Sequence, residues 1–265
     1  MKRQRERWKW FAFTAAASVL VLAWVGFWLY CGRIQLNGMA VRKYTVRGVD
    51  VSHYQGDIDW KRLSEQDIHF AYIKATEGSS HVDEKFSENW REVRNTDLKA
   101  GAYHFFSFDS PGADQVKNFT SQVEAFDGML PPVVDFEFYG DKEQNRPEVG
   151  AATEQLQVVL DGLEAYYHVK PIIYATEPSW KAYLSQGFSE YPLWIRNVKS
   201  RPSSAIPDWT FWQFSNRKKL DGYQGQERYI DMNVFCGNQR QWEYWTQKTA
   251  EGFNYSPKWG TEPPD

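Results

Sequence analysis

Residues 133–138 read VVDFEF, an apolar run interrupted only by Asp135 and Glu137. Seven further short runs rich in apolar residues lie between residues 46 and 235. Such runs are typical of parallel strands that are covered on both faces, as in α/β proteins. The predicted strands are residues 46–52, 69–74, 100–106, 133–138, 171–175, 193–196, 210–214 and 229–235.

Amphipathic stretches separate the early strands, whereas polar loops join the later ones. Ser110 and Pro111 mark a helix start, and apolar residues then recur with helical spacing at Val116, Phe119 and Val123. Helices are predicted at residues 59–66, 83–96, 111–126, 156–167 and 178–186, but not within 197–208 or 215–228. Five β/α units followed by three strands predict an irregular TIM-like (β/α)5(β)3 barrel, a single domain over residues 46–247.

The N-terminal region predicts a membrane helix. Residues 10–30 are 21 residues without a charge, long enough for a hydrocarbon core of about 30 Å. A cleaved signal peptide would have a shorter apolar region of about 7–15 residues and a small-residue cleavage site, whereas this stretch ends in FWLY. We therefore expect an uncleaved single-pass anchor, with the basic tail of residues 1–9 in the cytoplasm and the barrel periplasmic or extracellular.

The segments outside the barrel are expected to be simple. Residues 31–45 read as a basic linker and residues 248–265 as a polar tail. The chain is expected to be loose from Thr246 onward, where it is polar and contains three prolines. We expect that deleting residues 1–45 would cost the barrel no core contact and would leave a soluble monomer.

Charge and cysteine content exclude several classes of function. The net charge of −3 hides a balance of −11 from Gly48 onward, because the segments before it are basic. An acidic main body argues against nucleic acid as a partner. Two cysteines and scattered histidines predict neither a disulfide scaffold nor a metal site, and no cofactor is indicated.

Acidic residues stand at the ends of four predicted strands, where the chemistry of a parallel barrel gathers. They are Asp50, Glu77, Asp135 with Glu137, and Asp231. Asp135 and Glu137 are two apart, so they share a face of the strand with Cα atoms roughly 6.6 Å apart. Burial of two nearby carboxyls favours one protonated acid and one carboxylate, the combination that glycoside cleavage requires. Glu137, nearer the rim, is expected to donate the proton, and the deeper Asp135 to remain ionised.

The motifs resemble the glycoside hydrolase family 25 lysozymes, the Chalaropsis-type N-acetylmuramidases. The resemblance covers about residues 46–245 and rests on motifs in the family's order: GVDVS at 48–52, AYIKATEG at 71–78, GAYHFF at 101–106, VDFE at 134–137, PIIY at 171–174, WQ at 212–213 and DMNVF at 231–235. It implies the (β/α)5(β)3 barrel and hydrolysis of the β-1,4 bond between N-acetylmuramic acid and N-acetylglucosamine in peptidoglycan, with retention of configuration.

The resemblance also implies roles for the acids. Glu137 matches the general acid/base, and Asp135 matches a carboxylate that acts either as nucleophile or as orienter of the substrate's N-acetyl group. Asp50 and Asp231 match two supporting acids. The chain departs from the family's pattern at Arg196, where family members usually carry a small residue.

Substrate contacts are expected from aromatic residues at strand ends, although barrel packing is an equal alternative for each of them. The candidates are Tyr103, Tyr174, Trp194 and Trp212, together with Glu77. A chitinase-like barrel would carry an acid where this chain has Val133. The alternative function is a membrane-tethered peptidoglycan-binding protein whose catalysis is weak or lost.

Overall fold

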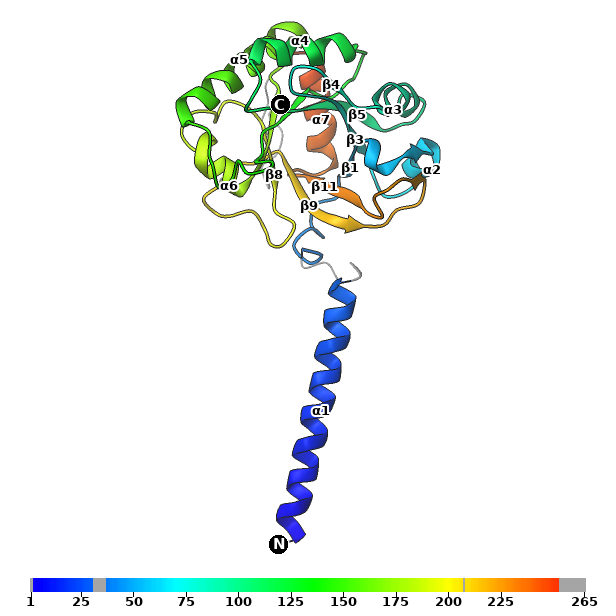
Figure 1. Ribbon diagram of the computed structural model, residues 1–265. Coiled ribbons are helices and arrows are strands. Elements are labelled where there is room, and N and C mark those ends of the chain that lie inside the picture. Colours follow the sequence, from blue (N-terminus) through cyan, green and yellow to red (C-terminus); the bar gives the residue numbers. More distant parts are fainter. Residues whose placement is uncertain (1, 31–36, 207, 253–265) are drawn as a thin grey trace.

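The computed structural model describes residues 2–30, 37–206 and 208–252. In this part of the chain eight strands close a barrel (Figure 1), and this confirms the predicted fold class. In order around the barrel they are β1 (Arg47–Val51), β3 (Phe70–Glu77), β5 (Lys99–Phe105), β6 (Val133–Asp135), β7 (Ile172–Thr176), β8 (Leu193–Arg196), β9 (Phe211–Lys218) and β11 (Ile230–Phe235). Neighbours are parallel except at β11, which runs antiparallel to both β9 and β1.

Helices occupy the connections between β1 and β8, as the periodicity predicts. They are α2 (Trp60–Ser64), α3 (Phe86–Val93), α4 (Gly112–Gln122), α5 (Val149–Tyr167) and α6 (Glu177–Ser179), which continues into the π-helical turn η2 (Trp180–Leu184). Minor elements are the 3-10 turn η1 (His53–Gln55), the pair β2 (Asp57–Ile58) with β10 (Tyr223–Gln224), and β4 (His81–Val82), which pairs with the end of β3.

Alternation along the strands creates two apolar layers. On β7, Ile172 and Tyr174 point into the barrel, whereas Ile173 and Ala175 point outward. The outer layer packs against buried stripes on α3, α4 and α5. Two glycines leave space for aromatic rings of the inner layer. A Cβ on Gly48 would lie 2.4 Å from the Phe70 ring, and one on Gly101 would lie 2.2 Å from the Tyr72 ring, so a side chain at either position would collide with the ring.

A C-terminal helix that the sequence analysis missed closes the barrel floor. Helix α7 (Gln239–Ala250) is capped by Asn238 and places Trp242 and Trp245 in the inner layer, where Trp242 packs 5.3 Å from Phe70. The expectation of a loose tail from Thr246 is therefore wrong as far as Ala250, because α7 continues to that residue. The rest of the predicted tail, residues 253–265, lies outside the described residues.

The last part of the predicted linker packs on the barrel. Residues 37–45, the docked segment, form a turn in which Asn37, Val41 and Tyr44 are buried. The Tyr44 ring packs edge-on against Trp209 and Trp212, with ring centroids 5.4 and 6.3 Å away. The docked segment thus covers the outer face of β9, so the expectation that residues 1–45 make no core contact is wrong. Residues 31–36 of the linker lie outside the described residues.

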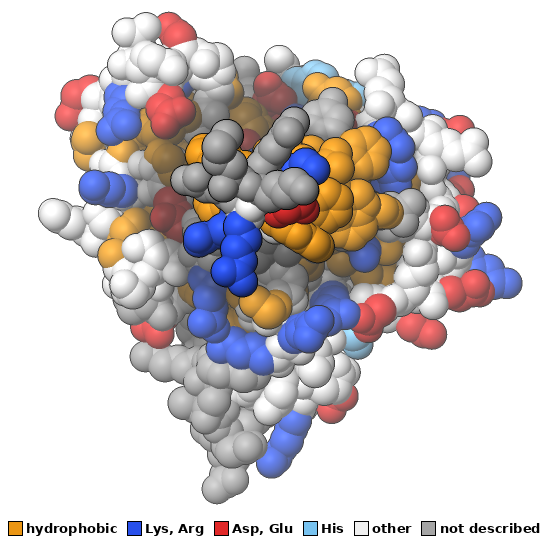
Figure 2. All heavy atoms as spheres, turned by 90° about the horizontal axis from the view of Figure 1, so that it is seen from below, with side chains coloured by type: hydrophobic (Ala, Val, Ile, Leu, Met, Phe, Trp, Pro, Cys, Tyr) orange, Lys and Arg blue, Asp and Glu red, His pale blue; other side chains and the backbone are white. Residues whose placement is uncertain are grey.

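Helix α1 (Lys2–Tyr30) stands away from the barrel (Figure 1). Its segment Glu6–Trp28 has a mean hydropathy of 1.9 with none of it buried, and it is long and apolar enough to cross a membrane. The view from the α1 end (Figure 2) shows large apolar side chains gathered at its centre, where α1 faces the viewer.

Candidate active site

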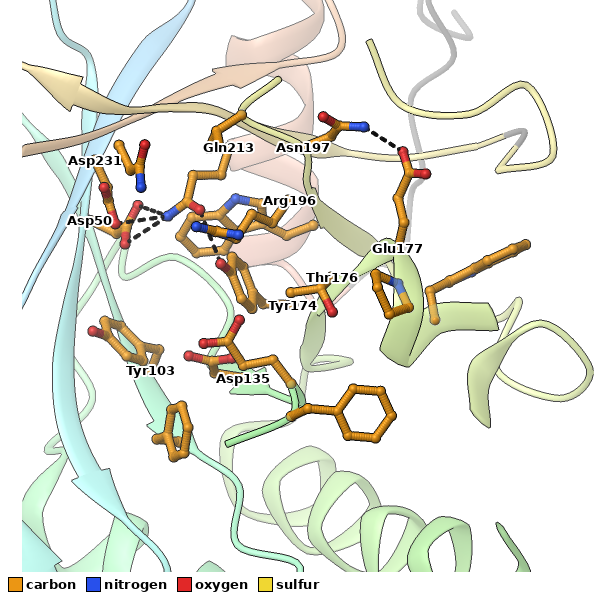
Figure 3. A pocket seen from close by; sticks show the side chains of 18 of the residues that line it. Asp50, Tyr103, Asp135, Tyr174, Thr176, Glu177, Arg196, Asn197, Gln213 and Asp231 are labelled. Carbon is orange, nitrogen blue, oxygen red and sulfur yellow. Dashed lines mark hydrogen bonds between the residues drawn. The ribbon is translucent and has the colours of Figure 1, made fainter. Parts of the chain in front are cut away.

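A cavity of about 1650 Å³ opens at the barrel rim where β1 and β3–β9 end. All four predicted catalytic acids line it: Asp50, Asp135, Glu137 and Asp231 (Figure 3 labels three of them). Asp231 arrives by an unexpected route, because it lies at the start of β11 rather than at its end. Since β11 is antiparallel, its first residues meet the carboxyl ends of the other strands, and Asp231 pairs with Asp50 in the β1–β11 register.

Asp135 and Glu137 share the cavity face of their segment. Asp135 is the last residue of β6, and Glu137 follows just beyond the strand. Phe136 between them points outward and packs against Phe106 and Tyr183, so the two acids are fixed by a buried ring. The carboxylate of Glu137 makes no hydrogen bond to a described residue, and Oδ1 of Asp135 is buried without a partner. Both carboxyls are thus left for a ligand to engage.

Asp50 and Asp231, in contrast, are held by amides. Nε2 of Gln213 donates to Asp50 Oδ1 and Oδ2 at 3.2 and 3.0 Å and to Asp231 Oδ2 at 3.1 Å. Nδ2 of Asn233 donates to Asp50 Oδ2 at 2.7 Å. Neither amide is among the site residues predicted from the sequence, although each is a polar residue inside an apolar strand.

Two aromatic residues set the direction of these amides. Nε1 of Trp194 can only donate, and it donates to Oδ1 of Asn233 at 2.9 Å, so the NH₂ group of Asn233 must face Asp50. The hydroxyl of Tyr174 donates to Oε1 of Gln213 at 3.0 Å with the same effect. Trp194 and Tyr174 themselves line the cavity, so the two residues that orient the amides are part of its wall.

Burial governs the protonation of the acids. Removal from water raises the pKa of all four carboxyl groups, and the neighbouring Glu137 raises the pKa of Asp135 further. The hydrogen bonds from Asn233 and Gln213 act in the opposite direction on the pKa of Asp50. The deeper position of Asp135 therefore does not favour its ionised form, contrary to the sequence-based expectation, because depth is what desolvates it.

Two of the predicted substrate-contacting residues do not line the cavity. Trp212 points outward, where its ring is buried beside Tyr44 and its Nε1 donates to the Asn197 carbonyl at 2.9 Å. Its neighbour Gln213 is the residue of that pair that faces the acids. Glu77 follows an irregularity in β3 and accepts a 2.7 Å hydrogen bond from Lys74, so it reaches the site only through that lysine. Tyr103 does line the cavity (Figure 3).

The rim beside β8 is organised around Asn197. Nδ2 of Asn197 donates to Glu177 Oε1 at 2.8 Å, and the backbone N–H of Ser203 donates to the same oxygen at 2.9 Å. All three residues line the cavity. From the other side, Nδ2 of Asn37 in the docked segment donates to the Asn197 and Phe214 carbonyls at 3.1 and 2.9 Å. Within the described residues no group of three or more His, Cys, Asp and Glu side chains is arranged to hold a metal ion.

A β/α barrel with two paired carboxyls in an open rim cavity is typical of the glycoside hydrolases. A family model described as glycosyl hydrolases family 25 matches residues 49–223. The chain belongs to this family.

Relatives agree with this assignment. The protein YegX of Escherichia coli K12 is 33% identical over 234 residues, 85% of this chain and 82% of that protein. Lysozyme M1 of Streptomyces globisporus is 32% identical over 207 residues, 73% of this chain and 68% of that protein. The solved structure of a family 25 glycosyl hydrolase from Bacillus anthracis is 47% identical and has a TM-score of 0.73, with 77% of this chain and 94% of that chain covered.

Proposed function

We propose that this enzyme is a lysozyme that hydrolyses the β-1,4 bond between N-acetylmuramic acid and N-acetylglucosamine in peptidoglycan, with retention of configuration. The observation that carries the proposal is the pair Asp135 and Glu137, two cavity-facing carboxyls without a hydrogen-bonding partner on the described side chains. Membership of the family and the name of a similar lysozyme support the substrate. Retention rests on the resemblance of the VDFE motif to that of the family.

Glu137 is proposed as the general acid and base. Burial raises the pKa of Glu137 and so favours the protonated form that a proton donor needs, and Glu137 stands beyond the end of β6 where a substrate oxygen can approach. Glu137 gives its proton to the glycosidic oxygen as the bond to the anomeric carbon breaks. It then takes a proton from the water that adds to that carbon, which restores the acid.

Asp135 is proposed to assist on the anomeric side. An unpartnered buried carboxylate oxygen is costly for the free enzyme, and a substrate relieves this cost in either of two ways. Asp135 Oδ1 can accept a hydrogen bond from the N–H of the substrate's N-acetyl group, whose carbonyl oxygen then bonds to the anomeric carbon as the leaving sugar departs. Alternatively, Asp135 can itself bond to that carbon as nucleophile. In either case water then displaces the bonded oxygen, and the two displacements give retention. Asp50 and Asp231 are proposed to support the site through the field of their charges and their hydrogen bonds to Gln213.

Product analysis tests this function. Purified peptidoglycan is digested and the fragments are reduced with borohydride and analysed by mass spectrometry. We expect muramitol at the reducing ends, and early proton NMR spectra should show the β-anomer first. Glucosaminitol ends would contradict the bond assignment, and an α-anomer first would contradict retention. Binding to peptidoglycan without any release of fragments would favour the alternative, a tethered wall-binding protein.

We also propose that α1 is a single-pass anchor, with residues 1–9 in the cytoplasm and the barrel outside it as a monomer. The length and exposed apolar surface of α1 support a membrane span, and a peptidoglycan substrate requires the barrel beyond the membrane. Alkaline phosphatase fused after Asp265 should be active in cells. An inactive phosphatase fusion beside an active cytoplasmic reporter at the same site would reverse the topology.

A further inference from the structure

Arg196 brings a cation into the cavity beside the acids. It ends β8, where Trp194 two residues earlier belongs to the inner layer, so the alternation of the strand turns Arg196 toward the cavity as well. It is half-buried, and it pairs in register with Thr176 on β7 and Gln213 on β9. Figure 3 shows its guanidinium group beside Gln213 and Tyr174, facing the space above Asp135.

The guanidinium group of Arg196 forms no hydrogen bond or ion pair with a described residue. Lys74, the other cation close to the acids, is already engaged by Glu77 at 2.7 Å. The positive charge of Arg196 is nevertheless felt by all four acids, whose pKa values it lowers. Arg196 therefore stands near the acids while its N–H groups remain available to a ligand. A half-buried guanidinium with free donors is suited to a planar anion, which it binds with two parallel hydrogen bonds.

The proposed substrate offers one anionic group on the sugar itself. N-acetylmuramic acid differs from N-acetylglucosamine by a lactyl ether, which ends in a carboxylate when no peptide is attached and in an amide carbonyl when one is. Because one of the two sugars at the scissile bond is N-acetylmuramic acid, a lactyl group enters the cavity close to Asp135 and Glu137. Apart from Lys74, which is paired with Glu77, the other cations that line the cavity, such as Lys181 and Lys199, are exposed, and water weakens their attraction for an anion.

We propose that Arg196 is a specificity-determining residue that binds the carboxyl oxygens of the lactyl group. This inference rests on the proposed function. A free lactyl carboxylate accepts two charge-assisted hydrogen bonds from the guanidinium group, and an amide-linked lactyl group accepts one through its carbonyl. The enzyme should therefore prefer strands with free lactyl carboxylates.

Two forms of the same glycan test this proposal. Peptide-free strands are prepared with free lactyl carboxylates, and a second portion is converted to the lactyl methylamide. We expect wild-type kcat/KM to be about 10-fold or more higher on the carboxylate form, which is the size of effect expected for a charge-assisted hydrogen bond. R196A should lose that preference, and R196K should keep part of it, because lysine retains the charge but not the planar fork.

Controls separate the possible failures. K199A removes an exposed cation from the same cavity and should keep the wild-type ratio between the two substrates. If R196A and R196K, with melting curves like that of the wild type, lower kcat/KM equally on both substrates, Arg196 acts on the acids and the proposal is overturned. If the wild type cleaves neither substrate, the proposed function fails instead.

Discussion

The barrel has two sides that hold their acids in different ways. At the end of β6 and just beyond it, Asp135 and Glu137 face the cavity without hydrogen-bonding partners on described residues. Across the cavity, Asp50 is clamped by two amides, and one of these, Gln213, also reaches Asp231. The clamp occupies lone pairs of Asp50 and fixes its position. Asp135 and Glu137, the open pair, are suited to exchange protons and bonds with a substrate. Asp50 and Asp231, the clamped pair, are suited to supply a fixed electrostatic field.

The outer faces of the strands on the two sides are also covered by different parts of the chain. Helices α3, α4 and α5 cover β3, β5 and β6 through regular apolar stripes. Strand β9 is covered instead by the docked segment of residues 37–45. The open pair of acids therefore stands on a conventional β/α scaffold, whereas the clamped pair depends on contacts between distant parts of the chain.

The largest expected effect is the loss of turnover when a carboxyl of the open pair is replaced by an amide. Glu137→Gln keeps the shape of the side chain but removes the transferable proton, and general acid catalysis contributes about 10²–10⁴-fold to the rate. Asp135→Asn should lower turnover by a comparable factor. The measurement is turnover on purified peptidoglycan, with circular dichroism to confirm folding. Near wild-type turnover by a folded Glu137→Gln enzyme would refute the assignment of the proton donor.

The second prediction concerns the docked segment. Deletion of residues 1–36 keeps Asn37, Val41 and Tyr44, so this variant should unfold cooperatively with full activity. Deletion of residues 1–45 exposes the apolar surface of β9, and the loss of Val41 and Tyr44 should cost about 3–6 kcal/mol, since each buried side chain of this kind contributes about 1.5–3 kcal/mol. Urea denaturation measures the difference.

A point variant separates packing from positioning in the docked segment. Asn37→Ala removes the side-chain donor from the Phe214 carbonyl, whereas the Asn197 carbonyl keeps its hydrogen bond from Trp212 Nε1. A buried polar group left unpaired costs about 1–3 kcal/mol. Equal stability of the two deletion variants would show that the docked segment does not contribute to the barrel.

The third prediction concerns the hydrogen bonds that Gln213 and Asn233 donate to Asp50. Asp50→Asn leaves one accepting oxygen where Gln213 and Asn233 donate to two, and its NH₂ group meets the NH₂ group of a neighbour, so at least one of these hydrogen bonds is lost. We expect a destabilisation of about 1–3 kcal/mol and a loss of turnover smaller than that of Glu137→Gln. Thermal melting and turnover are measured on the same preparation. A turnover loss as large as that of Glu137→Gln would mean that Asp50 takes part directly in the chemistry.

The sequence predicted the side of β3–β7 well because its signals are local. Each strand is an apolar run, each helix carries its own stripe, and alternation within VVDFEF brings Asp135 and Glu137 to one face. All four predicted catalytic acids do line one cavity. Their catalytic roles stay predictions.

The other side depends on long-range contacts that no local pattern shows. Neither the direction of β11 nor the contact of Asn37 with Asn197 follows from periodicity. Trp212 was misplaced because a shift of one residue turns a side chain to the opposite face. Gln213 is a polar residue inside the apolar run FWQF. It could have indicated that Gln213, and not Trp212, lies on the cavity side of this strand.

The smallest predicted effect has the opposite sign and uses Asp135→Asn again, now for stability. Burial raises the pKa of Asp135 in the folded protein above the value of about 3.9 in an unfolded chain. The favourable contribution of this group to folding is therefore complete below that unfolded value and is lost as the pH rises through the folded pKa. At neutral pH the ionised form is a cost to the fold, and Asn removes this cost.

Asp135→Asn should therefore melt at a higher temperature than the wild type at pH 7, by about 2–4 °C if the gain is about 1 kcal/mol. The difference should shrink toward zero near pH 4, where the wild-type carboxyl is also neutral. Asp50→Asn serves as the comparison: burial raises the pKa of Asp50 as well, but the loss of hydrogen bonds should outweigh the relief of its charge and lower the melting temperature at pH 7. A gain for Asp135→Asn that did not depend on pH would point to better packing and not to relief of a buried charge. Opposite signs for these two isosteric Asp-to-Asn changes would establish that the hydrogen bonds from Gln213 and Asn233 offset the cost of burying Asp50, whereas Asp135 has no such hydrogen bonds.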